Sequence, residues 1–474
     1  MPNVTLRPYQ ERDVQRLRDA FRSGFKSPLY VLSTGGGKTV VFSHITSSAA
    51  ARGNRVLILV HRAELLHQSS ESLTSLGGVE HGLIAPGHTM TDHAVQVASV
   101  QTLARRLGRI PTPDLIVMDE AHHAGAETWA KILRAYPDAR IIGVTATPCR
   151  LDGTGLGKHV GGFFDTMIQG PSISDLIAGG FLCPPKVYAP PTGLDLKSVK
   201  SRYGDYVKSE LDAAVDKPKI TGSAVEHYRR LCPGTPAICF CVSVAHAEHV
   251  AAEFKSAGFR AASVDGSMHD GARKAAIRGL GTGSVQVLTS CDIVSEGTDI
   301  PVVGAAILLR PTQSLGLYLQ QVGRALRPYP GKQHAVILDH VGNVIRHGMP
   351  DSDREWSLEG RPRRGTPGES KDLTLKVKQC ERCYVVHTPA PKCPACGHEY
   401  DDMPLPEQVA GELREIDEET AEFMRRARNR ERGRLMSQAK SLEDMQDVAK
   451  QLGYSSGWAW HAWKNKGGRR AAGR

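Results

Sequence analysis

The sequence predicts two α/β domains in tandem, each built on a parallel β-sheet, followed by a small cysteine-rich unit and a mainly helical, charged tail. Three observations lead to this fold class. Short apolar runs alternate with amphipathic segments between about residues 28 and 145, which is the pattern of βαβ units. The same alternation returns after residue 230. Beyond residue 345 glycine, proline and charged residues dominate, and four cysteines stand in two close pairs.

Buried strands are expected wherever a short apolar run is bounded by glycine, proline or aspartate. In the first domain they fall at Leu29–Leu32, Val56–Val60, Val95–Ser99, Leu115–Met118 and Arg140–Val144. In the second they fall at Ala237–Cys241, Ala261–Val264, Val285–Leu288, Ala305–Leu309 and Ala335–Asp339. The stretch between them, about 170–230, has weaker periodicity, and part of it is expected to pack onto the second domain.

The expected boundaries follow these changes in pattern. A chain of 474 residues is long enough for several units, because single cores rarely grow beyond about 250–300 residues. We expect the first domain at 1–170, the second at 171–350, a linker at 351–374 with a flexible stretch at 360–368, the cysteine-rich unit at 375–402 and the tail at 403–474.

The composition narrows the surroundings in which the chain works. A net charge of +10 favours a polyanionic partner without proving one. The N-terminus has no apolar signal core and no stretch approaches the roughly 18 apolar residues of a membrane span, so no membrane partner is expected. Six of the ten cysteines are scattered singly, which indicates a reducing compartment, the cytoplasm of a bacterium or of a phage-infected host.

A glycine-rich turn lies between the first expected strand and an expected helix. It reads Ser33-Thr34-Gly35-Gly36-Gly37-Lys38-Thr39. Its glycines let backbone N–H groups approach a phosphate where a Cβ would clash, so Thr34 and the three glycines are expected to cradle a nucleotide. Lys38 would reach its β- and γ-phosphates and Thr39 would bind Mg²⁺. The alternative is a turn before a surface lysine, since Leu32 stands where the general motif has its first glycine.

Two acidic residues emerge where another expected strand ends. Asp119 and Glu120 follow an apolar run, at the sheet edge where α/β proteins bind ligands. Asp119 suits a water-mediated contact to Mg²⁺, and Glu120 suits the base that activates an attacking water. A solvated Asp-Glu pair is a poor alternative after four apolar residues. Lys38, Asp119 and Glu120 are therefore the expected catalytic residues of the first domain.

These motifs resemble those of superfamily 2 helicases and translocases. Residues 119–122 (Asp-Glu-Ala-His) resemble the DEAH box and 145–148 (Thr-Ala-Thr-Pro) motif III, while residues 6–10 resemble the Q motif. Residues 61–68 and 99–103 resemble the strand-contacting motifs Ia and Ic. The resemblance implies two RecA-like domains, adenine recognition by Gln10, nucleic-acid contacts by Arg62, Gln101 and Thr102, and coupling of the ATP site to the nucleic-acid surface by His122 and Thr145.

The second expected domain carries a complement to this site. Residues 289–301 resemble motif V, which implies that Gly297 and Asp299 face the nucleotide. Residues 320–327 resemble motif VI, with Gln320 in the catalytic set. Arg324 and Arg327, three apart on an expected helix, project from one face and could reach a γ-phosphate held by the first domain. The alternative is a surface helix with two solvated arginines. Motif IV is expected near 238–243, with Ser243 at the nucleic-acid surface.

Two Cys-x-x-Cys pairs, Cys380/Cys383 and Cys393/Cys396, are separated by nine residues. Each pair can turn both thiolates toward one ion, so the two together predict a tetrahedral Zn²⁺ site in a small ribbon. Disulfides or a redox pair are the alternatives. The ribbon is basic, which fits nucleic-acid contact, but a structural or protein-docking role is equally open.

The tail has two features with open interpretations. Residues 425–434 carry six arginines against one glutamate, which fits a phosphate-contacting helix, a solvated face, or pairing with the acidic stretch 399–422. Trp458, Trp460 and Trp463 beside basic residues fit base stacking or a small hydrophobic cap. This ending and the ribbon resemble the RadD type of bacterial DNA-repair ATPases and related phage-encoded helicases.

Together these features predict an ATP-dependent motor that moves on or remodels single-stranded or branched DNA in replication, repair or recombination. ATP, Mg²⁺ and Zn²⁺ are its expected ligands, and replication or repair proteins are possible partners of its C-terminal region. Two alternatives stay open: an ATP-gated DNA-binding factor without strand separation, and an RNA helicase. No wedge that would separate strands can be read from the sequence.

Overall fold

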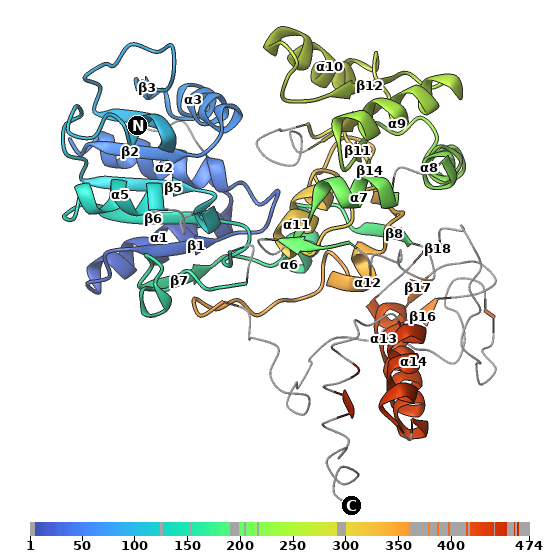
Figure 1. Cartoon of the computed structure of the whole chain (residues 1–474). Coiled ribbons are helices and arrows are strands. Elements are labelled where there is room, and N and C mark those ends of the chain that lie inside the picture. Colours follow the sequence, from blue (N-terminus) through green and yellow to red (C-terminus); the bar gives the residue numbers. More distant parts are fainter. Residues whose placement is uncertain are drawn as a thin grey trace, which may run out of the picture.

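Two α/β units lie side by side, each built on a seven-stranded sheet (Figure 1). The computed structural model describes residues 5–123, 127–150, 153–189, 199–202, 205–215, 218–291, 300–360, 378–379, 386–387, 397–398, 414–415, 418–439, 441–452, 459 and 462–463. Across these ranges no helix is both long and apolar enough to cross a membrane.

The first sheet is parallel throughout, in the order β3-β4-β2-β5-β6-β1-β7. Its inner strands are continuous buried runs, as expected when helices cover both faces. The strands are β1 Pro28–Val31, β2 Val56–Val60, β3 Gly82–Ile84, β4 Val95–Ser99, β5 Leu115–Asp119, β6 Arg140–Thr145 and β7 Thr166–Gln169. The helices are α1 Pro8–Arg22, α2 Lys38–Ala50, α3 Ala63–Gly77, α4 Val100–Leu103 and α5 Glu127–Ala135, with 3₁₀ turns η1 Ala121–His123 and η2 Lys158–Val160.

The second sheet has the order β12-β13-β11-β14-β15-β8-β18, parallel except for the antiparallel edge strand β18. Its strands are β8 Pro185–Ala189, β11 Ala237–Phe240, β12 Ala261–Val264, β13 Val287–Ser290, β14 Ala305–Leu308, β15 Ala335–Asp339 and β18 Arg414–Glu415. A two-stranded hairpin is formed by β9 Ser201–Arg202 and β10 Asp205–Tyr206. The helices are α6 Ile173–Ala178, α7 Lys208–Val215, α8 Pro218–Leu231, α9 Val244–Ser256, α10 Asp270–Thr282, α11 Leu315–Gly323 and α12 Asn343–His347.

All ten strands expected from the apolar runs are present, nine of them with nearly the expected bounds. The tenth, β13, begins two residues later than expected. Val285 belongs instead to the turn after α10, where its N–H donates to the carbonyl of Gly279. The sequence did not single out β3, β7 or β18, which lie at sheet edges, or β8, which lies next to the edge strand β18. Strand β8 pairs with β15, so part of 170–230 does pack onto the second sheet.

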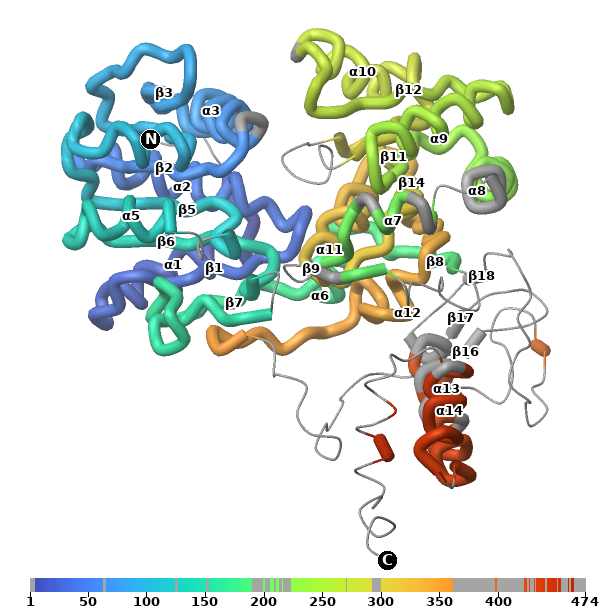
Figure 2. The backbone as a smooth tube through the Cα atoms, viewed as in Figure 1, coloured from blue at the N-terminus to red at the C-terminus, as the bar shows by residue number. Residues whose placement is uncertain are grey.

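A segment at residues 350–360, which we call the return strap, runs from the second sheet back to the first (Figure 2, orange, after α12). The carbonyl of Leu358 accepts the N–H of Gly157 at 2.9 Å, and Gly360 forms a β-bridge with Thr154. Trp356 packs against the buried clusters on both faces of the first sheet. The two sheets are therefore joined by contacts at both ends of this strap.

The C-terminal described residues form a small separate cluster. Helices α13 (Glu418–Gln438) and α14 (Leu442–Leu452) pack with Ala459, Ala462 and the partly buried Trp463, which agrees with the hydrophobic-cap interpretation for this tryptophan. Arg426 pairs with Glu422 at 2.9 Å, one turn earlier on α13. A short hairpin is formed by β16 (Lys378–Gln379) and β17 (Val386–His387). The four cysteines of the predicted zinc site, and Trp458 and Trp460, lie outside the described residues.

Candidate active site

The glycine-rich turn joins β1 to α2, with Gly37 as the N-cap of the helix. Gly35 and Gly37 have φ angles of +86° and +84°, a region that L side chains rarely adopt. The carbonyl of Gly36 accepts hydrogen bonds from Tyr9 Oη at 2.8 Å and from Gln10 Nε2 at 3.1 Å. Glycine therefore allows the conformation of the turn, and the two hydrogen bonds fix the turn to the start of α1.

Gln10, the predicted adenine reader, is almost fully buried. Its Oε1 accepts the N–H of Arg7 at 2.9 Å while its amide donates to Gly36. It therefore contacts the phosphate-binding turn directly. The contribution of Tyr9 was missed from the sequence, although it stands beside Gln10 in the same motif.

The acidic pair lies at the carboxyl end of β5, next to this turn. Asp119 is buried and its Oδ1 accepts the N–H of Glu120 at 2.9 Å. Glu120 has a φ of +49°, the only positive value at a non-glycine position among the described residues. Such strain is concentrated at functional sites, where the surrounding structure maintains it.

Charged groups from both sheets influence one another's pKa values at this site. Burial raises the pKa of Asp119, the charge of Glu120 raises it further, and Lys38 opposes the shift. Burial lowers the pKa of Lys38; Glu120 and Asp119 oppose this effect, and Arg324 and Arg327 add to it. The arginines of the second sheet are thus close enough to act on the lysine of the first.

The sequence predicted that the two arginines lie on one helix, and this prediction was wrong. Helix α11 ends at Gly323, Arg324 is its C-cap, and Arg327 follows in a bend. Arg327 cannot belong to the helix, because Pro328 has no N–H to donate to the carbonyl of Arg324 and disfavours helical backbone at Arg327. The turn nevertheless leaves Arg324 buried and brings both side chains toward the first sheet.

Direct contacts join the two halves at three glycines. A Cβ at Gly323 would lie 2.5 Å from Thr34 Cγ2, and one at Gly316 would lie 2.9 Å from Thr147 Oγ1. A Cβ at Gly35 would lie 3.9 Å from Arg327 Cγ. Helix α11 therefore rests against both the phosphate-binding turn and the loop after β6.

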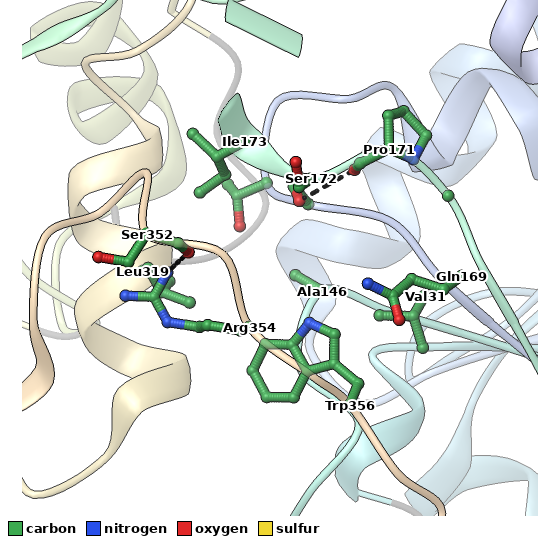
Figure 3. Close-up of a pocket in the computed structure, with 13 residues that line it drawn as sticks. Val31, Ala146, Gln169, Pro171, Ser172, Ile173, Leu319, Ser352, Arg354 and Trp356 are labelled. Carbon is green, nitrogen blue, oxygen red and sulfur yellow. Dashed lines mark hydrogen bonds between the residues drawn. The ribbon is translucent and has the colours of Figure 1, made fainter. Parts of the chain in front are cut away.

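A cavity of about 30 Å³ lies beside these contacts (Figure 3). That volume is enough for one or two water molecules. Its lining includes Ser33 and Thr34 of the turn, the segment 169–173 that begins at the end of β7, Leu319 of α11, and Arg354 and Trp356 of the return strap.

A chain of polar contacts leads from Glu120 to the same interface. His122 Nδ1 lies 3.3 Å from Glu120 Oε2 and 3.1 Å from Thr145 Oγ1. The Thr145 hydroxyl donates to the carbonyl of Thr147 at 3.1 Å and accepts its N–H at 3.2 Å. The Thr145 hydroxyl donates its only proton to Thr147, so it can only accept a hydrogen bond from His122. His122 Nδ1 is therefore assigned a proton. We call Glu120, His122, Thr145 and Thr147 the polar relay.

The predicted nucleic-acid residues of the first sheet lie near one another. Gln101 Nε2 donates to the carbonyl of His61 at 3.4 Å, next to Arg62, and Thr102 follows on α4. The ring of His61 lies 4.1 Å from that of His123, which in turn lies 4.1 Å from His122. This row of three histidine rings, tilted against one another and unnoticed in the sequence, connects the predicted strand-contacting loops to the polar relay.

The remaining predicted site residues make structural contacts or lie outside the described residues. Ser243 caps α9 by accepting the N–H of His246 at 3.0 Å, a role that explains it without a ligand. Gln320 is buried on α11, and Thr39 lies in the first turn of α2. Gly297 and Asp299 of the predicted motif V, and the four zinc cysteines, lie outside the described residues. Within those residues, no group of three or more His, Cys, Asp or Glu is arranged to hold a metal.

Comparison with known families gives matches over both halves of the site. Residues 3–150 match the family described as "Type III restriction enzyme, res subunit", and residues 223–329 match "Helicase conserved C-terminal domain". These ranges contain the phosphate-binding turn and acidic pair in one case and the arginine turn in the other.

Similar sequences occur in phage and yeast. A 51.5 kDa protein of a Lactococcus phage is 34% identical over 369 residues, covering 77% of this chain and 76% of its own. A Saccharomyces cerevisiae protein, named as the ATP-dependent helicase IRC3, is 31% identical over 358 residues. That alignment covers 71% of this chain but only 51% of the yeast protein.

Two solved structures share the fold. A fragment of an HsdR subunit of a type I restriction enzyme from Vibrio vulnificus is 23% identical, with a TM-score of 0.59 over 74% of this chain and 67% of its own. The type ISP restriction-modification enzyme LlaBIII, bound to DNA, is 17% identical, with a TM-score of 0.52 over 71% of this chain and 28% of its own.

Proposed function

Since the chain belongs to superfamily 2 of the helicases and is an ATP-hydrolysing enzyme of that kind, we propose that it is a motor that moves on or remodels DNA. Closure of its two RecA-like domains around ATP and Mg²⁺ would drive the movement. The supporting observation is the meeting of the two halves of the site, with Gly323 of α11 against Thr34 of the phosphate-binding turn.

The proposed roles follow the geometry. Thr34, Gly35, Gly36 and Gly37 cradle the phosphates, Lys38 reaches the β- and γ-phosphates, and Gln10 recognises the adenine. Thr39 and Asp119 hold Mg²⁺, whose charge offsets that of the phosphates, and Glu120 activates the attacking water. These residues fit the ligands because the turn leaves no Cβ in the phosphate cradle and Asp119 lies buried beside Lys38.

Arg324 and Arg327 stabilise the charge on the transferring phosphoryl group, with Gln320, Gly297 and Asp299 completing the second half of the site. An arginine supplied by a moving partner is worth about 10³–10⁵ in rate. Hydrolysis then depends on the position of the turn after α11, and that dependence couples chemistry to domain motion.

The remaining chain supplies substrate choice in this proposal. We assign 1–170 and 171–350 to the two motor domains, 351–374 to a linker, 375–402 to a ribbon in which Cys380, Cys383, Cys393 and Cys396 bind Zn²⁺, and 403–474 to a tail. The ribbon and tail, which resemble RadD-type proteins, would contact branched or single-stranded DNA or repair proteins. Arg62, Gln101, Thr102 and Ser243 would line the path of the strand.

DNA is preferred over RNA because of the kinds of relative found. One of the two similar structures is a fragment of a restriction-enzyme subunit, and the other is a restriction-modification enzyme bound to DNA. A shorter similarity is to a protein named DNA 3'-5' translocase. The translocase name favours a second candidate, movement along DNA without strand separation. An RNA helicase is the third, since two further relatives carry that name.

An ATPase screen tests the proposal. The chain is assayed with single-stranded, duplex and forked DNA and with RNA, beside Glu120→Gln. We expect DNA to stimulate turnover and Glu120→Gln to abolish it while ATP binding is kept. Equal or better stimulation by RNA, or wild-type turnover in Glu120→Gln, would refute the DNA assignment or the assignment of the base. Displacement of a strand from forked DNA, compared with translocation on single strands, separates the first two candidates.

A further inference from the structure

The turn that carries the two arginines is stabilised in an unusual way, because its backbone carbonyls lack helical partners. Pro328 and Pro330 have no N–H groups, so α11 cannot extend through this stretch. The carbonyl of Leu326 instead accepts the N–H of Cys183 at 2.7 Å. The carbonyls on either side of it, those of Ala325 and Arg327, both accept hydrogen bonds from the side chain of Lys332.

Lys332 makes a third bond of the same kind. Its Nζ donates to the carbonyl of Val303 at 2.7 Å and to that of Arg327 at 2.6 Å. An ammonium group has three N–H donors, and here each has a carbonyl acceptor. Hydrogen bonds from a charged donor are roughly twice as strong as neutral ones. One charge therefore joins the arginine turn to the loop before β14, which follows directly after the predicted motif V.

The joined turn lies against the phosphate-binding turn of the other sheet. The Cβ position of Gly35 is 3.9 Å from Arg327 Cγ and 2.8 Å from Leu182 Cδ2. Leu182 precedes Cys183, the residue whose N–H binds the carbonyl of Leu326. A change in the shape of the arginine turn would therefore alter its contacts with the phosphate-binding turn at Gly35.

We propose that Lys332 is a positioning residue for ATP hydrolysis: it holds the turn at 324–327 in the shape that presents Arg324 and Arg327 to the nucleotide. The inference rests on the proposed function, because Lys332 acts only through these arginines. Its own ammonium is directed at backbone carbonyls of the second sheet. Burial lowers its pKa to about 8, with Arg327 acting in the same direction and Cys183 opposing it, so the group is charged at neutral pH.

The test compares Lys332→Met with a matched variant, Lys255→Met, whose lysine is exposed in the last turn of α9. In steady-state ATPase assays at saturating DNA, we expect Lys332→Met to lower kcat about 10- to 100-fold, while KM for ATP changes less than about threefold. An arginine that acts on the transition state affects kcat, whereas a merely loosened domain would weaken ATP binding as well. Lys255→Met should retain the wild-type kcat. Wild-type kcat in Lys332→Met would overturn the inference.

Adding Lys332→Met to a variant that lacks both arginines, Arg324→Ala/Arg327→Ala, identifies the route of the effect. If Lys332 acts through the turn, the triple variant is no slower than Arg324→Ala/Arg327→Ala. Losses that multiply would overturn the inference, because Lys332 would then act elsewhere. Wild-type kcat in Arg324→Ala/Arg327→Ala would instead contradict the proposed function. Should Lys332→Met fail to fold, Lys332→Gln replaces it. Its neutral amide has only two N–H donors for the three carbonyls, so a smaller loss of kcat is expected. Wild-type kcat in a folded Lys332→Gln would show that neither the charge nor the third bond positions the turn, and would overturn the inference.

Discussion

Gly323, the last residue of α11, lies so close to Thr34 that a Cβ at position 323 would be 2.5 Å from Thr34 Cγ2. The contact joins the helix that precedes the arginine turn to the turn that binds phosphate. Gly323→Ala is therefore expected to oppose closure of the site. Overpacking of this kind costs about 1–3 kcal/mol, and each 1.4 kcal/mol is about tenfold. We expect kcat for ATP to fall about 10- to 100-fold in steady-state assays.

The matched control is Gly281→Ala on α10, a helix that packs on the same sheet as α11. A Cβ there meets nothing within 4 Å, so the variant should hydrolyse ATP at the wild-type rate and gain slightly in helix stability. If both alanine variants lose rate equally, contact between Gly323 and Thr34 is not what limits closure.

Much of this fold could be predicted because its signals are local. Each inner strand is a short apolar run buried on both faces, and the acidic pair stands at the end of one of them. The phosphate-binding turn needs glycines at Gly35 and Gly37 for positive φ, and such a requirement is visible in the sequence itself.

The parts that were missed depend on residues far apart in the chain. The spacing of Arg324 and Arg327 suggested that they share a helix, but α11 ends at Gly323, and Pro328 excludes Arg327 from a helix. Lys332, beyond the end of α11, then binds the carbonyls of the turn. The return strap has no apolar pattern of its own. It docks because Gly155 and Gly360 let two backbones approach each other, about 200 residues apart in sequence, and no local pattern announces such a partner.

The return strap is expected to help hold the two sheets together. A Cβ at Gly155 would overlap the carbonyl of Leu358, so Gly155→Ala should displace the strap from the first sheet. We expect a larger radius of gyration by small-angle X-ray scattering and a severalfold lower ATPase rate without DNA. Gly281→Ala again serves as the control. An unchanged radius together with an unchanged rate would show that the strap does not constrain the sheets.

Asp165 should stabilise the first domain in a pH-dependent way. Its carboxylate accepts the N–H groups of Lys26 at 2.9 Å and Ser27 at 3.1 Å and pairs with Lys158 at 3.2 Å. Burial raises the pKa of Asp165, but these donors outweigh that effect and lower the pKa overall. A depressed folded-state pKa gives stability above the unfolded value of about 4, which is lost as pH falls through the folded value.

Asp165→Asn is therefore expected to lower the free energy of unfolding by about 1–3 kcal/mol at pH 7, measured by chemical denaturation. The difference in the free energy of unfolding between Asp165→Asn and the wild type should narrow as the pH falls below about 4. Asp138→Asn, at an exposed position in the same domain, should be neutral at every pH. A difference that stays constant with pH would mean that the charge of Asp165 contributes nothing.

The polar relay predicts a variant that binds ATP but responds poorly to DNA. Thr145 is fully buried, and its hydroxyl connects His122, which contacts Glu120, to Thr147, which faces Gly316 of α11. Thr145→Val keeps the shape and removes the hydroxyl. The N–H of Thr147 and Nδ1 of His122 then lose their shared acceptor, at a cost of about 1–3 kcal/mol.

If the relay couples the base to the second sheet, Thr145→Val should lose about tenfold in DNA-stimulated turnover, while turnover without DNA and ATP affinity change less than about threefold. The control is Thr46→Val on α2. Its hydroxyl is also buried but has no hydrogen-bond partner among the described residues, so its removal should leave the stimulation intact. Equal losses with and without DNA in Thr145→Val would make the hydroxyl a support for Glu120 alone. If DNA stimulates Thr145→Val as strongly as the wild type, the polar relay does not couple DNA binding to hydrolysis. The coupling would then depend on the contacts of Gly323 and Arg327 with the phosphate-binding turn.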